Sequence, residues 1–154
     1  MVKQPDPEAE RKRAWLSRYR QSLAEQQYLA CAIQETRSRS MSISVTIAPG
    51  RAAPTGTHSD RVADSVQRLD ALERQLRQEQ QRGQAIAAEI ITAAYKLPCK
   101  LAEVLCCQYI DGMGTAQIAR KMGLSASAVS NRKSAALAAL DVPPDTAENE
   151  KCGK

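Results

Sequence analysis

The 154-residue sequence predicts an all-α fold, in which a long antiparallel helical hairpin with a coiled-coil-like arm precedes a C-terminal three-helix helix-turn-helix unit. Two observations predict the hairpin. Long stretches are almost free of glycine and proline, and their apolar residues recur at steps of three and four. A third observation predicts the C-terminal unit, because residues 115–140 have the pattern of two short helices joined by a tight turn.

The first long helix is expected from about Glu8 to Arg39, a stretch without glycine or proline. Gln26 fills one gap in its apolar seam and Trp15 is expected at one edge of it. The predicted seam residues are Leu16, Tyr19, Leu23, Ala30 and Ile33. Such a seam implies that the helix faces another helix.

The chain changes character after this helix. In residues 40–58, Ile43, Val45 and Ile47 alternate with serine and threonine, and two prolines and two glycines follow. We expect a short extended piece and then a flexible loop.

Three consecutive cations lie near the start of the first predicted helix, namely Arg11, Lys12 and Arg13. They are interpreted as a solvated helix start, with a contact to a DNA backbone as the alternative.

A second long helix is expected to be capped by Ser59 or Asp60 and to run to about Leu97. Its seven-residue repeat comprises Val62, Leu69, Leu76, Gly83, Ile90 and Leu97, with companions Ser65, Leu72, Glu79, Ile86 and Ala93. Gly83 and Glu79 are predicted to weaken this seam midway. The first helix is the obvious partner, and a second chain could pack alongside.

Pro98 separates the hairpin from a third helix, predicted over Lys100 to Asp111. One face of this helix carries Leu101, Val104, Leu105 and Tyr109 and should form the floor for the helix-turn-helix pair. Gly112 and Gly114 are expected to end it, and Thr115 to cap the next helix. The predicted domains are therefore a hairpin at 8–97 with its loop at 40–58, a helix-turn-helix unit at 98–140 and a disordered tail at 141–154.

The helix-turn-helix itself follows from local chemistry. Gly123 can adopt the left-handed conformation that ends the first helix, and the hydroxyl of Ser125 can cap the second. The residues predicted to face inward are Ile118, Ala119, Met122, Leu124, Val129, Ala136, Leu137 and Leu140. A unit of this kind presents one helix to the major groove of DNA.

The bulk properties allow this role. The net charge of +5 and the isoelectric point near 9.1 suit a nucleic-acid partner, although the excess is modest. No membrane span is expected. No cofactor or metal is expected, because the lone His58 lies in the predicted loop and the five cysteines lack CxxC spacing: Cys31, Cys99, Cys106, Cys107 and Cys152. An enzyme is disfavoured, because no catalytic set or glycine-rich phosphate loop occurs.

Residues Tyr109 to Leu140 resemble region 4 of bacterial sigma factors, with an acidic-glycine turn before the first helix and an Ala-Leu-x-x-Leu end at Ala136, Leu137 and Leu140. Over residues 14–140 the chain resembles phage-encoded transcriptional regulators of the RinA/ArpU-like group, which begin with a WLxRYR helix, here Trp15 to Arg20. This resemblance implies control of phage or prophage transcription in the cytoplasm of a bacterial host. Arg132 departs from the pattern, because that position is usually apolar, and it is expected to extend along the surface if the helix register is right.

If the resemblance holds, the residues expected to contact base edges are Ala126, Ser127, Ser130, Asn131 and Ser134, with Asn131 the best candidate for adenine. The residues expected to contact phosphates are Lys100, Arg120, Lys121, Arg132 and Lys133. The alternative is that all of these are ordinary solvated surface residues.

Three functions stay open at this level. A sequence-specific regulator that binds double-stranded DNA, expected as a homodimer, is the leading hypothesis. A DNA-packaging protein similar to phage small terminase subunits is the alternative, since these also join a helix-turn-helix to an oligomerising helical region. The sigma-like unit could instead bind host RNA polymerase.

Overall fold

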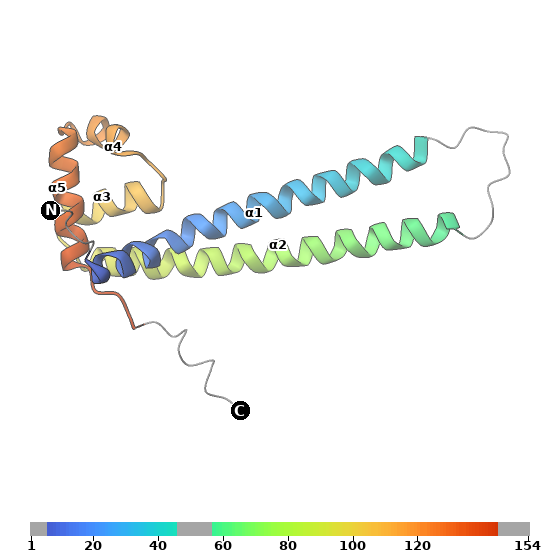
Figure 1. The fold of residues 1–154 in the computed structure, drawn as a ribbon, viewed down its shortest axis with the longest axis horizontal. Coiled ribbons are helices and arrows are strands. Elements are labelled where there is room, and N and C mark those ends of the chain that lie inside the picture. Colours follow the sequence, from blue (N-terminus) through green and yellow to red (C-terminus); the bar gives the residue numbers. More distant parts are fainter. Residues whose placement is uncertain (1–5, 46–56, 145–154) are drawn as a thin grey trace, which may run out of the picture. The chain divides into compact units, whose positions relative to one another are not determined.

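The computed structural model describes residues 6–45 and 57–144, and all secondary structure in these ranges is α-helical (Figure 1). These described ranges contain five helices, namely α1 (Pro7–Val45), α2 (Thr57–Tyr95), α3 (Cys99–Tyr109), α4 (Thr115–Met122) and α5 (Ala126–Ala139). The predicted all-α fold, with a helical hairpin followed by three short helices, is confirmed.

The contacts divide the chain into two compact units. We call Met1–Arg20 together with Ile86–Lys154 the head unit, and Gln21–Ala85 the hairpin unit. Each unit contains a part of α1 and a part of α2. The three short helices therefore fold together with the start of α1 and the end of α2.

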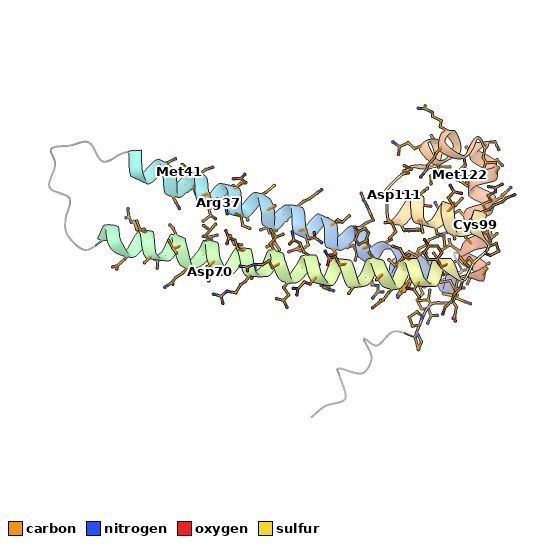
Figure 2. All side chains as sticks on the ribbon, turned by 180° about the vertical axis from the view of Figure 1, so that it is seen from behind. Arg37, Met41, Asp70, Cys99, Asp111 and Met122 are labelled. Carbon is orange, nitrogen blue, oxygen red and sulfur yellow. The ribbon has the colours of Figure 1, made fainter. Side chains whose placement is uncertain are left out.

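In the hairpin unit, the contacts between α1 and α2 show that the two helices are antiparallel. Ser22 Oγ and Gln26 Nε2 each lie 3.4 Å from the backbone oxygen of Glu79. Arg37, which Figure 2 labels farther along α1, pairs with Glu73 at 2.8 Å. Higher numbers on α1 thus meet lower numbers on α2, as a helical hairpin requires.

The predicted seam of α1 was partly in the wrong register. Leu29 is buried and Ala30 is exposed, although Ala30 was the predicted seam residue. Ser22 is likewise more buried than the predicted Leu23. The seam runs through Ser22, Gln26, Leu29, Ile33 and Thr36, so small and polar residues occupy positions that an apolar pattern cannot reveal.

The heptad seam of α2 is confirmed except at its start. Val62 is 52% exposed, whereas the other predicted seam residues are buried or half-buried. Contrary to the prediction, Gly83 does not weaken the packing. A Cβ atom on it would lie 2.7 Å from Gln26 Nε2 and 2.8 Å from Ser22 Oγ, so the absent side chain lets α1 approach α2 closely.

The main core of the head unit joins α1, α2, α3 and α5. It contains Trp15, Leu16, Ile86, Ile90, Leu105, Tyr109, Ala136, Leu137, Leu140 and Val142. Trp15 is thus a core residue rather than an edge residue. Val142, which the sequence assigned to a disordered tail, is buried against the same cluster, and residues 145–154 lie outside the described ranges.

The prediction for Lys12 was also wrong, because this side chain is buried instead of solvated. Its Nζ forms an ion pair with Glu8 at 3.0 Å and lies 3.4 Å from the backbone oxygen of Ala138. The last carbonyl groups of a helix have no partner within the helix and carry partial negative charge. Lys12 therefore stabilises the C-terminal end of α5 from the first turns of α1.

Several helix ends also differ from the predictions. α1 continues to Val45, so Ile43 and Val45 are helical rather than extended, while Ile47 lies outside the described residues. α2 starts at Thr57, which places His58, Ser59 and Asp60 within its first turn rather than in a loop or at the cap. Short sequence signals locate helix ends only to within a few residues, because packing decides the rest.

Leu16→Ala tests whether the start of α1 belongs to the core of the head unit. Leu16 is fully buried, so the free energy of unfolding should fall by about 2–5 kcal/mol. Tyr28→Ala is the control on the same helix, because Tyr28 is 68% exposed and should change stability by only about 0.5 kcal/mol. Urea unfolding followed by circular dichroism measures both, and equal effects would contradict the assignment.

Candidate nucleic-acid interface

α4 and α5 pack on α3 through a second, smaller core. Val104 and Cys107 of α3 meet Ile118 and Ala119 of α4 and Val129 of α5, and all five are buried. The partly buried residues Met113, Met122 and Leu124 pack around them. The predicted inward-facing residues of the helix-turn-helix are therefore confirmed.

The turn between α4 and α5 has the predicted chemistry. Gly123 has a φ of 65°, and the backbone N–H of Leu124 donates to the Ala119 oxygen at 2.9 Å. Ser125 caps α5, its Oγ accepting from the Ala128 N–H at 3.1 Å. Together these fix the direction in which α5 leaves the turn.

The predicted cap of α4 was wrong by one residue. Gly114 is the N-cap, and Thr115 is the first helical residue. The side chain of Gln117 folds back to accept from the Gly114 N–H at 3.0 Å, so it takes one role of a capping box.

The outer face of α5 is open along the candidate base-contacting residues. All five are exposed, namely Ala126, Ser127, Ser130, Asn131 and Ser134. Four of them lie in the first half of α5, close to its N-terminus. Ser134 differs, because it also lines a cleft with residues from the first turns of α1. α5 contains no acidic residue that would repel a DNA backbone from this face.

The candidate phosphate contacts fall into two groups. Lys100, Arg120 and Lys121 are exposed, on α3 and α4, whereas Arg132 and Lys133 on α5 are half-buried. Half-burial of Arg132 beside the fully buried Val129 supports the predicted helix register, with the Arg132 stem packed along the surface.

The surroundings of two of these lysines shift their pKa values. The Nζ of Lys121 lies 3.4 Å from Cys107 Sγ, and this hydrogen bond, with the nearby acidic groups, raises the pKa of Lys121. Burial lowers the pKa of Lys133, and the positive charge of Arg13 lowers it further. Lys121 is thus directed back toward α3, whereas Lys133 is a cation that its surroundings disfavour.

Cys106 and Cys107 of α3 fit a structural role, whereas Cys99 at the start of this helix is exposed. Cys107 is buried in the smaller core. Burial is the main cause that raises the pKa of Cys106, so the Cys106 thiol stays protonated at neutral pH.

Within residues 6–45 and 57–144, no three His, Cys, Asp or Glu side chains lie together as a metal site would need. No helix in the described ranges has the length and apolar character to cross a membrane.

Comparison with known proteins supports the same segment. Residues 87–140 match the family model described as "Sigma-70, region 4". This segment is sigma region 4-like. The match supports a DNA-binding, regulatory role for it. No curated protein and no solved structure matched the chain significantly.

The sigma region 4-like segment begins inside α2, earlier than the predicted unit at 98–140. The end of α2 contributes the fully buried Ile90 and Ala94 to the head unit, and Ile90 lies in its main core. The heptad repeat had pointed to Ile90 as a hairpin residue. The burial of Ala94, four residues on and outside the predicted seam, shows a second packing partner that apolar periodicity alone did not reveal.

The two glycines flanking α4 give a matched test of the turn. Gly123→Ala should lower the free energy of unfolding by about 1–2 kcal/mol, because a side chain is disfavoured at φ 65° even though the Cβ atom would have open space. Gly114→Ser should be neutral or stabilising, because its φ of −74° is ordinary, no atom lies near the added Cβ, and a serine caps well. Thermal unfolding compares the two variants, and an equally destabilising Gly114→Ser would contradict the cap geometry.

Proposed function

We propose that this protein is a sequence-specific DNA-binding transcriptional regulator of phage or prophage genes, acting by binding rather than by catalysis. The observation that supports this most is the exposed outer face of α5, small, polar and free of acids, within a sigma region 4-like segment. The resemblance of its Trp15 to Arg20 motif to phage regulators supplies the phage context.

In this proposal, the first half of α5 enters the major groove and reads base edges. The Asn131 amide can donate to and accept from adenine, serine hydroxyls can do either, and the Ala126 methyl group can contact thymine. Few cations lie on α5, only Arg132 and Lys133, so non-specific attraction is modest and base contacts carry much of the discrimination.

A sigma region 4-like segment also suits contact with host RNA polymerase, as a partner in transcription control. Such a contact requires a surface other than the base-reading face of α5, so both partners could bind together. Pull-down of polymerase without DNA tests this part of the proposal.

Asn131→Ala tests base reading. Against the preferred duplex, the loss of its paired hydrogen bonds should cost about 1–3 kcal/mol of binding free energy, with a much smaller loss on random DNA. Gln84→Ala removes an exposed amide from the hairpin unit and should change neither affinity. Mobility-shift titrations with the selected and the random duplex measure the dissociation constants of both variants and of the unaltered protein.

Two results would overturn the proposal in different ways. Absence of any binding by the unaltered protein at low salt, where phosphate contacts are strongest, would refute DNA binding itself. Equal losses for Asn131→Ala on both duplexes would show that this residue reads no base.

We also propose that the protein is a homodimer, paired through exposed apolar residues near the start of α2 in the hairpin unit. Val62 and Val66 are 52% and 60% exposed and lie one turn apart on α2, and Met41 of α1 is 73% exposed. Within residues 57–85, five arginines are balanced by five acidic residues, so a second copy of α2 meets no net repulsion. Pairing would also set the spacing of two DNA half-sites.

Val66→Lys should convert the dimer to a monomer, because it places a charge within the apolar contact. Gln75→Lys adds the same charge nine residues away, on the opposite side of α2, and should leave the dimer intact. Light scattering gives the mass of each variant. A monomeric unaltered protein would contradict pairing, and a large ring would instead favour the packaging role.

A further inference from the structure

A cleft lies between the first turns of α1 and the second half of α5, both within the head unit. Asp6, Glu8, Lys12 and Arg13 line it from the α1 side, and Ser134 from the α5 side. No pattern in the sequence predicts that the α1 residues meet Ser134, because they are more than a hundred positions apart.

The two acids of this cleft already have partners. Glu8 pairs with Lys12 at 3.0 Å, and an Asp6 carboxylate oxygen accepts the Glu8 backbone N–H at 3.1 Å, as a helix cap does. Lys12 is neutralised by Glu8 and directed to the Ala138 carbonyl. Among the described residues, Arg13 has no ion-pair partner.

Arg13 and Ser134 line this cleft, and Lys133, the residue before Ser134, lies near enough to Arg13 to be affected by its positive charge. Burial lowers the pKa of Lys133 and Arg13 lowers it further, while no acid among the described residues forms an ion pair with either cation. Both groups remain accessible, since Arg13 is exposed and Lys133 only half-buried. Arg13 shares the cleft with the Ser134 hydroxyl, and Lys133 precedes Ser134 on α5. Two cations without an ion-pair partner and a hydroxyl are well suited to an oxyanion with negative charge spread over several oxygens.

The position of Lys133 on α5 indicates which anion the two cations would bind. Lys133 lies seven residues beyond Ala126, about 10 Å farther along the helix axis. The major groove is about 12 Å wide, so a helix whose N-terminal residues read bases has its later residues near the strand at the groove edge.

We propose that Arg13 and Lys133, with the Ser134 hydroxyl, bind one DNA backbone phosphate at the edge of the groove. The start of α1 is then part of the DNA interface, although it lies outside the sigma region 4-like segment. This inference rests on the proposed DNA-binding function. It adds a contact that fixes the position of α5 on the duplex without reading sequence.

The test uses the full chain with Arg13→Ala, Lys133→Ala and the double variant. Each single change should weaken binding about five-fold, equally on preferred and random duplexes, because a phosphate contact carries no sequence information. The double variant should reduce the slope of log affinity against log salt by about 0.9, the value for one phosphate. Its loss should be smaller than the product of the single losses, since both side chains share one anion.

Arg11→Ala is the matched control, because Arg11 is exposed on α1 only two residues away, on a different side of the helix. It should leave affinity and salt slope unchanged. Arg13→Gln keeps most of the side-chain stem and tests the charge alone if Arg13→Ala unfolds the head unit, which circular dichroism would reveal.

The outcomes separate this inference from the function it rests on. If the unaltered protein binds no DNA, the proposed function itself fails. If it binds DNA but Arg13→Ala and Arg13→Gln behave like Arg11→Ala, the shared phosphate site is wrong and the proposed function stands. A larger loss on the preferred duplex than on random DNA would also overturn it, by showing base readout at Arg13.

Discussion

The packing of α1 against the inner side of α5 is the constraint on which the head unit depends. Ala136, Leu137 and Leu140 lie in one core with Trp15 and Leu16, and Lys12 lies at the last carbonyls of the same helix. A helix of 14 residues is marginal on its own and needs tertiary contacts. Because α1 and α3 cover its inner side, α5 can keep small polar residues on its outer side and remain folded.

Features that depend on adjacent residues were predictable from the sequence. Gly123 is followed two residues later by Ser125, and this pair defines the end of one helix and the start of the next. The burial of Ile118, Ala119 and Val129 follows once these ends are known, since helical periodicity then fixes the inward face. For the same reason, the exposure of the candidate base-contacting residues could be predicted.

Features that depend on distant residues were not predictable. Ser22 lies in the seam of α1 in place of Leu23 because Gly83 leaves room for it, and neither residue alone signals that contact. Lys12 is buried because it meets the end of α5, 126 positions away. Apolar periodicity assigns a lysine to the surface, and only the partners supplied by the fold reverse that assignment.

Because the fold supplies partners to individual cations, the net charge of the chain says little about where DNA would bind. In the head unit, Lys12 and Arg18 are paired with Glu8 and Glu89, and Lys121 is directed to Cys107. These cations stabilise the fold and attract a backbone only weakly. Among the described residues, Arg13 and Lys133 beside α5 have no ion-pair partner, so the formal charge of +5 does not show where a DNA backbone would be attracted. A surface of this kind favours correct placement on a duplex over tight, indiscriminate binding, which is what the proposed reading of bases by small side chains on α5 requires.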